Sequence, residues 1–145
     1  MSKIEDFLSA EQEQFIVKAI KLAEKNTSGE IRVHIEKNAK KPSMERAKEV
    51  FQFLKMDQTH LKNGVLFYLA VESKQFAIIG DEGIHKLVPN NFWEIVKNKV
   101  LTNFAEKNYA KGLEQGIIEV GNQLKVYFPY ENDDANELPD KISKG

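Results

Sequence analysis

The sequence predicts an α/β protein built as a three-layer α/β/α sandwich around a small mixed sheet. A strand, a helix and a strand follow one another at 31–36, 43–55 and 64–71, the order of a right-handed parallel β-α-β crossover. Two apolar strands at 65–71 and 76–79 are joined by a short polar connection, which predicts an antiparallel hairpin. The flanking segments have apolar residues at helical spacing, so helices are expected on both faces of the sheet.

The first helix is expected at about residues 10–26. Ser9 and Gln12 have the spacing of a capping box, in which each side chain binds the backbone N–H of the other residue. Its buried stripe consists of Phe15, Ile16, Ala19, Ile20 and Ala23. Gly29 follows a short run of weak helix formers and suits the turn that ends the helix.

The first strand, at 31–36, alternates between apolar and polar residues. Its polar face carries Arg32, His34 and Glu36 and is expected at a sheet edge or under partial helix cover. The next helix begins at Pro42-Ser43, with a buried stripe of Ala47, Val50, Phe51 and Leu54.

The later elements are a central strand and two helices. The strand at 64–71 is apolar on both faces, as expected when helices cover both sides of a sheet. One helix opens at Asn91, which resembles a capping box with Glu94, and extends to about Lys107. The other spans about 109–126, and two of its glycines lie one turn apart, which indicates close packing against a neighbour.

Composition limits the classes of function. Residues 1–128 form one expected domain, and the polar, aperiodic residues 129–145 predict a disordered tail. With 21 basic and 22 acidic residues the net charge is −1, so no overall field attracts nucleic acid. Cysteine is absent, which removes disulfides and thiolate chemistry. Without a signal peptide or a membrane-length apolar run, a cytoplasmic protein with no integral membrane segment is expected.

Oxygen-bearing side chains gather where the hairpin and the first strand are expected to meet. Asn63 precedes the second strand, and Asp81 with Glu82 follows the third in the sequence Gly-Asp-Glu-Gly. Glu30 lies just before the first strand and reaches the same end of the sheet in a parallel crossover. Such oxygens, with carbonyls from glycine loops, suit Ca²⁺ or Mg²⁺. The structural alternative is that Asp81 and Glu82 cap a short helical turn.

Other chemistries have weaker support. His34, His60 and His85 lack the spacing of a zinc site, so surface or structurally bonded positions are expected for them. No GxSxG elbow, GxGxxG turn or GxxxxGK[ST] loop is present, which disfavours a serine hydrolase and standard nucleotide binding. Phe92 and Trp93 begin a helix with apolar spacing behind them, which predicts core packing.

Five segments, taken in order and with their spacing, resemble the TPM domain family. They are FLSAEQ at 7–12, TSGEIRVHIE at 27–36, NGVLFYLA at 63–70, FAIIGDEGI at 76–84 and FAEKNYAKGLEQGI at 104–117. The resemblance covers about residues 5–128 and implies an α/β/α sandwich. It also implies binding of a divalent cation, calcium in particular, at the strand ends, which here carry Glu30, Asn63, Asp81 and Glu82.

The chain departs from the family pattern in two ways. Many bacterial relatives carry a signal peptide and a C-terminal membrane helix or low-complexity tail, and this chain has neither. The third strand ends in G-D-E-G-I where the common family form is closer to G-Y-G-L-E.

The expected function is a domain that binds calcium or magnesium and acts as a binding or assembly factor for a protein partner that the sequence does not identify. The alternative, implied by a plant member that resembles an acid phosphatase, is a metal-assisted phosphomonoesterase. In that case Asp81 or Glu82 would hold the metal or position water. A third possibility is a structural partner-binding module that needs no metal.

Overall fold

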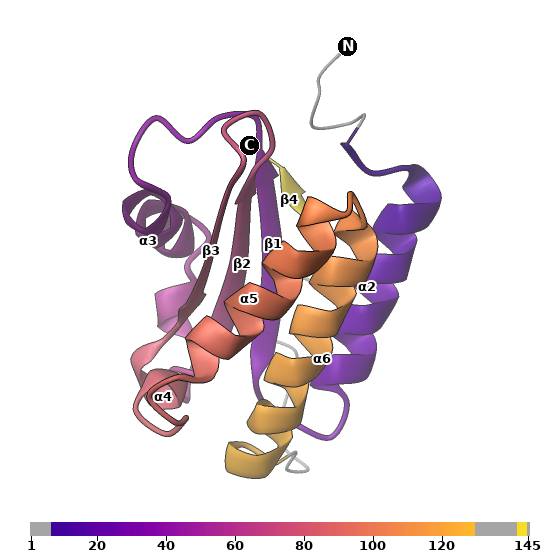
Figure 1. Ribbon diagram of the computed structural model, residues 1–145. Helices are drawn as coiled ribbons and strands as arrows, with labels where there is room; N and C mark the ends of the chain where they lie inside the picture. Colours follow the sequence, from indigo (N-terminus) through magenta and orange to yellow (C-terminus); the bar gives the residue numbers. More distant parts are fainter. Residues whose placement is uncertain (1–6, 130–141, 145) are drawn as a thin grey trace.

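The structure is a computed structural model that describes residues 7–129 and 142–144. A four-stranded sheet lies between two layers of helices (Figure 1), which confirms the predicted α/β/α sandwich. The strands are β1 (Glu30–Glu36), β2 (Gly64–Ala70), β3 (Gln75–Gly80) and β4 (Ser143–Lys144). The helices are α2 (Ala10–Glu24), α3 (Ser43–Phe53), α4 (Glu82–His85), α5 (Phe92–Ala105) and α6 (Tyr109–Tyr127), with a 3-10 helix, η1 (Met56–Gln58). None of the helices in the described residues is long and apolar enough to cross a membrane.

The sheet has the strand order β3-β2-β1-β4. β1 and β2 are parallel and are joined through α3, whereas β2 and β3 form the predicted antiparallel hairpin. β4 pairs in parallel with the other edge of β1, with Ser143 opposite His34. The prediction of a disordered tail over 129–145 did not include this strand, and residues 130–141 and 145 lie outside the described residues.

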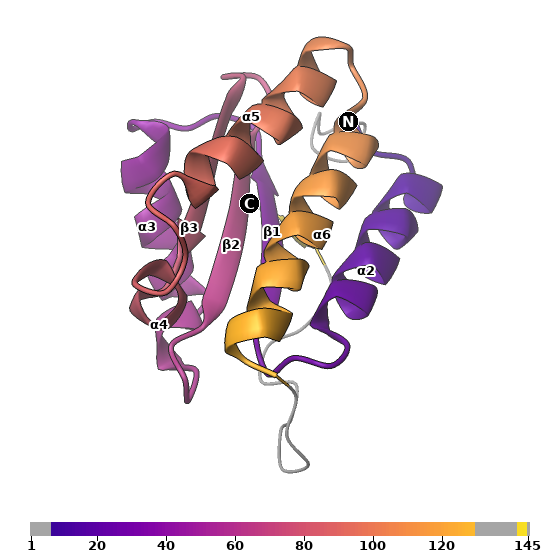
Figure 2. The same ribbon diagram turned by 60° about the horizontal axis from the view of Figure 1, so that its bottom comes forward.

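The two faces of the sheet bury apolar clusters of different size. On one face α6 lies between α5 and α2, and these three helices cover the larger cluster (Figure 2). On the other face α3 and η1 cover a smaller cluster, formed by Ala47, Val50, Phe51, Met56, Leu66, Tyr68, Ala70 and Ala77. The polar residues Arg32, His34 and Glu36 of β1 are buried. Since β1 directs its apolar residues into the larger cluster, these polar side chains lie on the face that carries α3.

Of the two capping boxes predicted at helix starts, the structure confirms the one at Ser9 and contradicts the one at Asn91. The capping box of α2 is confirmed, because Ser9 Oγ accepts the Gln12 N–H at 3.1 Å and Gln12 Oε1 accepts the Ser9 N–H at 2.9 Å. The capping box at Asn91 is wrong: its backbone (φ −97°, ψ 4°) is not extended, and its side chain makes no capping bond. Instead, α5 follows a turn in which the Phe92 N–H donates to the Pro89 carbonyl at 3.0 Å.

Glycines let α6 approach its neighbours closely, as the sequence indicated. A Cβ at Gly116 would lie 2.7 Å from Val100 Cγ2 of α5 and 2.8 Å from Phe67 Cε2 of β2. A Cβ at Gly121 would lie 2.7 Å from Ala23 Cβ and 3.0 Å from Ala23 Cα, so α2 and α6 are nearly in backbone contact there. The lower helix propensity of these glycines is thus offset by closer packing.

Gly121→Ala is expected to lower the free energy of unfolding by about 1–2 kcal/mol, although alanine has the higher helix propensity by about 1 kcal/mol. The added methyl group meets Ala23, including its backbone, which cannot rotate away. Urea unfolding measures the change, and Asn122→Ala at the exposed next position is the matched control, expected within about 0.5 kcal/mol of wild type. A Gly121→Ala variant with a free energy of unfolding equal to or above that of wild type would contradict the close α2–α6 contact.

Candidate functional site

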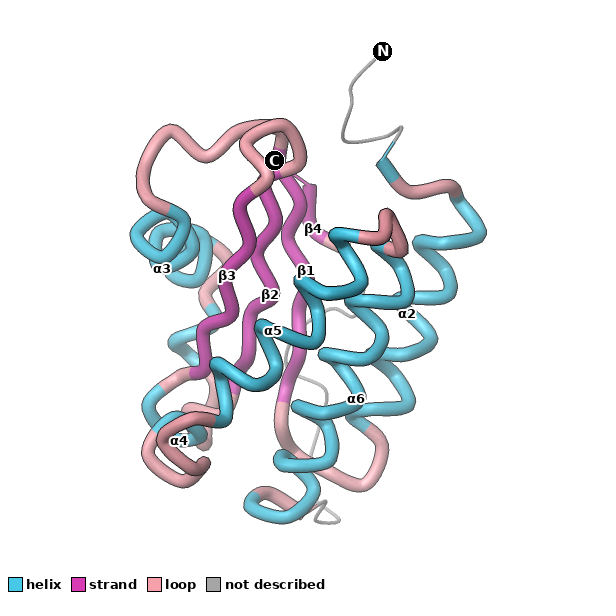
Figure 3. The backbone as a smooth tube through the Cα atoms, viewed as in Figure 1, coloured by secondary structure: helices cyan, strands magenta, loops and turns pink. Residues whose placement is uncertain are grey.

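The sheet topology brings the segments that carry the predicted site residues to one end of the sheet. Glu30 lies opposite Gly64 in the parallel pairing, and the Glu30 N–H donates to the Asn63 carbonyl at 3.4 Å. At the end of β3, the Asp81 N–H donates to the Gly64 carbonyl at 2.9 Å. The starts of β1 and β2 and the end of β3 therefore meet at the end of the sheet near α4, as Figure 3 shows.

Asp81 uses only one of its two carboxylate oxygens in the fold. It is the N-cap of α4, and its Oδ1 accepts the Glu82 N–H at 2.8 Å, so the capping alternative is confirmed for Asp81. Oδ2 is buried and has no hydrogen-bond partner among the described residues. Nearly all buried polar atoms in native proteins are paired, so this oxygen calls for a partner such as an ion or a water.

Asn63 and Glu30 both lie in the interior, with 1% and 2% of the residue exposed. Asn63 Nδ2 donates to Ser28 Oγ at 3.4 Å, which connects the segment before β2 with the segment before β1. Because the amide nitrogen is directed at Ser28, the amide oxygen is the atom of Asn63 that can serve a cation.

Glu82 differs from the other predicted site residues because it is exposed, at the first position of α4. Among the described residues, no three His, Cys, Asp or Glu side chains lie close enough together to hold one metal ion. The structure therefore brings Glu30, Asp81 and Glu82 to one end of the sheet without gathering their carboxylates into a metal cluster. A cation held here would need other oxygen ligands as well.

Backbone carbonyls supply such oxygens from the loop before β2. A Cβ at Gly83 would lie 2.3 Å from the carbonyl oxygens of both Leu61 and Lys62, so a side chain at this position would displace the loop. Lys62 has a left-handed backbone (φ 54°), which is uncommon outside glycine. In the same loop, Thr59 is buried, and its Oγ1 has no hydrogen-bond partner within residues 7–129 and 142–144. The sequence did not predict where these carbonyls point, because a carbonyl's direction has no signature in residue type.

His34 and His85 have structural partners, as expected. Nδ1 and Nε2 of His34 lie 3.1 Å from Ser143 Oγ and from Glu36 Oε1, respectively. His85 Nδ1 accepts the indole N–H of Trp93 at 3.1 Å. These contacts orient both rings, and neither ring is part of a cluster that could bind a metal among the described residues.

Glu36 is the centre of a buried polar network that the sequence did not reveal. Its carboxylate accepts two hydrogen bonds from Arg46 of α3, from Nε and Nη2, each at 2.9 Å. It also accepts hydrogen bonds from the Tyr68 hydroxyl of β2 and from His34. Because His34 in turn contacts Ser143 of β4, the network joins four elements of the fold.

The network fixes the charge state of its members near neutral pH. Burial alone would raise the pKa of Glu36, but hydrogen bonds from its three partners outweigh burial and lower the pKa to about 2. The hydrogen bonds to Glu36 raise the pKa of Arg46. Burial and the bond to Glu36 both raise the pKa of Tyr68. Burial lowers the pKa of His34 by more than the hydrogen bond and charge of Glu36 raise it. An ionised Glu36 and Arg46 therefore coexist with a neutral Tyr68 and His34.

Comparison with known proteins finds one relative that spans the whole chain. The BA42 protein from the psychrophilic bacterium Bizionia argentinensis, solved by NMR, is 53% identical and has a TM-score of 0.91 over 100% of both chains. A family model described as the TPM domain matches residues 2–123. No curated protein matches the chain.

Two more distant solved domains share the fold. The N-terminal domain of the cg2496 protein from Corynebacterium glutamicum is 16% identical, with a TM-score of 0.63 over 81% of this chain and 74% of that chain. The N-terminal domain of a P. gingivalis protein is 18% identical, with a TM-score of 0.68 over 87% and 83% of the two chains. At these identities the similarity shows the fold alone.

A parallel crossover followed by a hairpin, with polar groups at the strand ends and helices on both faces, defines a class of small α/β/α domains. Within this class the chain belongs to the TPM domain family. The family resemblance noted in the sequence is thereby confirmed.

The Glu36 network predicts a loss of stability in acid. The pKa of Glu36 is about 2 in the folded protein against a reference of 4.5, so its contribution is complete above about pH 5 and is lost as the pH falls towards 2. A difference of this size corresponds to about 3 kcal/mol. The pKa of His34 is also lowered in the folded protein, so the free energy of unfolding also falls as the pH drops below its reference pKa of 6.5. Urea unfolding from pH 7 to pH 3 measures the loss.

Glu36→Gln is expected to flatten this pH profile and to lower the free energy of unfolding at pH 7 by about 3 kcal/mol, since Arg46 loses its buried partner. Glu49→Gln is the matched control, because Glu49 also binds Arg46, at 3.3 Å, but is more exposed. We expect a change below about 1 kcal/mol for this control. Equal acid sensitivity of wild type and Glu36→Gln would show that other groups cause the loss.

Proposed function

We propose that this TPM domain binds a divalent cation, Ca²⁺ or Mg²⁺, at the starts of β1 and β2. The observation that carries the proposal is Asp81 Oδ2, a buried carboxylate oxygen to which no group in the described part of the chain donates a hydrogen bond. A buried anionic atom is unfavourable unless a positive group or a donor compensates it. A cation would provide this compensation, and the adjoining loop offers further oxygen ligands.

The residues present fit a hard cation with a mixed set of oxygen ligands. Asp81 would supply the anionic oxygen, and Asn63 its amide oxygen. The carbonyls of Leu61 and Lys62 lie against Gly83, two residues from Asp81. Ca²⁺ accepts carboxylate, amide and carbonyl oxygens together, and both Ca²⁺ and Mg²⁺ retain waters where protein ligands are few. A single unpartnered carboxylate therefore favours modest affinity.

Glu30 and Glu82 have secondary places in this proposal. Glu30 is buried in the first position of β1, and Glu82 is exposed on α4. Either carboxylate would act on the ion mainly through its charge or through a bridging water. The two residues thus tune the affinity, whereas Asp81 determines whether the site exists.

The proposed role is that of a binding or assembly factor whose surface depends on the ion. The loop before β2 and the first turn of α4 flank the hairpin on either side in sequence, lie at the same end of the sheet and touch at Gly83. A cation shared between them would hold the loop against α4 and so fix the shape of this end of the domain. A protein partner that recognises this end would then bind in a cation-dependent manner.

Calcium or magnesium is expected to raise the melting temperature of the wild-type domain, with a gain of about 2.7 kcal/mol at 100 times the dissociation constant. Asp81→Asn is expected to abolish the gain, because asparagine still caps α4 but removes the negative charge. Glu82→Gln is the matched control, since it removes a neighbouring exposed charge and leaves Oδ2 in place. Thermal melts with chelator and with each cation measure all three proteins.

Amide NMR with calcium then tests the location. Shift changes are expected within 28–30, 59–63 and 80–83. Equal stabilisation of wild type and Asp81→Asn, or shifts centred elsewhere, would contradict the proposed ligand. A wild-type domain that neither cation stabilises would favour the metal-free partner-binding module.

A further inference from the structure

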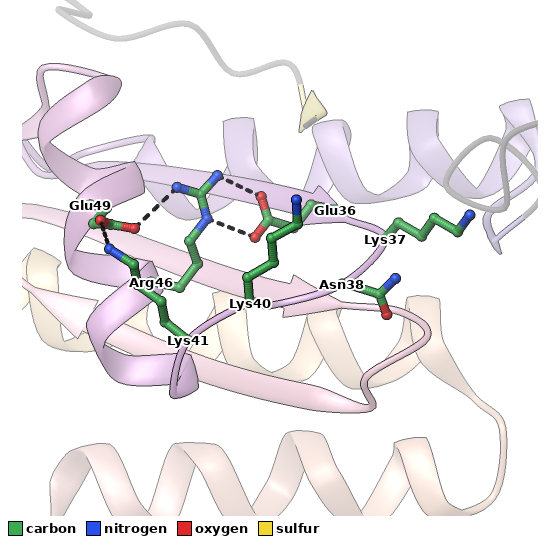
Figure 4. Close-up of a pocket in the computed structure, with 7 residues that line it drawn as sticks. All are labelled: Glu36, Lys37, Asn38, Lys40, Lys41, Arg46 and Glu49. Carbon is green, nitrogen blue, oxygen red and sulfur yellow. Dashed lines mark hydrogen bonds and ion pairs between the residues drawn. The ribbon is translucent and has the colours of Figure 1, made fainter.

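A second charged site lies at the opposite end of β1. A cavity of about 490 Å³ opens between the end of β1, the loop at 37–41 and α3 (Figure 4). Its charged lining consists of Lys37, Lys40, Lys41, Arg46, Glu36 and Glu49. Four cations against two carboxylates leave a net charge of +2 in this cavity, within a chain whose net charge is −1.

The two carboxylates of the cavity are already neutralised by partners within it. Glu36 is bound by Arg46 through two hydrogen bonds of 2.9 Å. Glu49 is bound by Lys41 and by Arg46 Nη1, the latter at 3.3 Å. These pairs hold the guanidinium of Arg46 in a fixed orientation at the base of the cavity (Figure 4).

The ammonium groups of two lysines, Lys40 and Lys37, lack a close ion pair within the described residues and can therefore contact an incoming ligand. Lys40 extends towards the Glu36–Arg46 pair in Figure 4, and no carboxylate of the described residues lies within 4.0 Å of its Nζ. Lys37 lies 4.0 Å from Glu72, the outer limit of an ion pair, with 58% of its side chain exposed. Exposed pairs of this length contribute little, so Lys37 can turn to a better partner.

The position of the cavity agrees with where α/β folds bind ligands. β1 and β2 are parallel, and the cavity lies beyond the carboxyl end of β1, where the crossover to α3 begins. Ligands of open α/β sheets bind in the crevice outside the carboxyl ends of the strands. The six-residue step from Glu30 to Glu36 places this cavity about 20 Å from the Asp81 end of the sheet.

We propose that this cavity binds a compact oxyanion with two or more negative charges, of the size of sulfate or pyrophosphate. Lys40 and Lys37 would contact the anion directly, and Arg46 would add the field of a cation that cannot rotate away from the cavity. Lysine ammonium groups bind such anions as point charges. Because the lining carries a net charge of +2, it attracts a dianion about twice as strongly as a monoanion at the same position.

A compact anion fits the observations better than a long polyanion does. Outside the cavity the chain has 17 basic and 20 acidic residues, so the rest of the chain carries no net positive charge. Nucleic acid binding needs a basic stripe that contacts successive phosphates. This site is independent of the proposed cation site, since it shares no residue with it.

The test is an amide NMR titration of the chelator-treated protein with sulfate, pyrophosphate and, at matched ionic strength, chloride. Saturable shifts are expected within residues 36–49, with pyrophosphate binding more tightly than sulfate and chloride producing no saturation. Chloride shifts equal to those of sulfate would overturn the proposal. Shifts confined to 28–30, 59–63 and 80–83 would also overturn it, because they would place the anion at the other end of the sheet.

Variants separate a site from general surface charge. Lys40→Gln is expected to weaken sulfate binding about tenfold, as the loss of one charged hydrogen bond predicts, and Lys37→Gln to weaken it less. Lys48→Gln is the matched control, because Lys48 is exposed on α3 and does not line the cavity. Equal effects of Lys40→Gln and Lys48→Gln would overturn the proposal. All three lysines are exposed, so the variants are expected to fold, and their spectra check this directly.

Discussion

The arrangement of α3 and of the sheet edge depends on the hydrogen bonds that the Glu36 carboxylate accepts. β1 has a polar face, yet the domain buries it. An ionised carboxylate is tolerated there only because Arg46, Tyr68 and His34 supply its hydrogen bonds. A buried ion pair adds little net stability over apolar packing, but separating its partners is costly. The network therefore determines where α3 and β4 lie, while the apolar clusters provide most of the stability.

The same crossover gives the two ends of β1 different chemistry. Connections that enter β1 and β2 meet at one end, where they present carbonyl and carboxylate oxygens beside α4. The connection that leaves β1 lies at the other end and presents lysines. At about 20 Å the ends are separated by more than the Debye length of about 8 Å at physiological salt. Screening would therefore let the two proposed ligands bind with little electrostatic effect on each other.

The sequence predicted what depends on local pattern and missed what depends on distant contacts. Periodicity located β1, β2, β3 and the long helices to within a few residues but missed β4, and the hairpin placed Asp81 beside the starts of β1 and β2. It could not reveal the network of Glu36, because Arg46 and Tyr68 are 10 and 32 positions away. The Asn91 capping box had the right residue types, but the turn at Pro89 had already set a backbone unsuited to capping.

Asp81 shows why the capping and cation-binding interpretations of one residue do not exclude each other. Capping requires a single acceptor, and Oδ1 provides it. Asparagine caps a helix about as well as aspartate, so α4 alone gives no reason for a second, charged oxygen at this partly exposed residue. A four-residue helix also has too small a dipole to stabilise that charge. The ligand proposed above would neutralise Oδ2 and would thus give a physical reason for a carboxylate at this position.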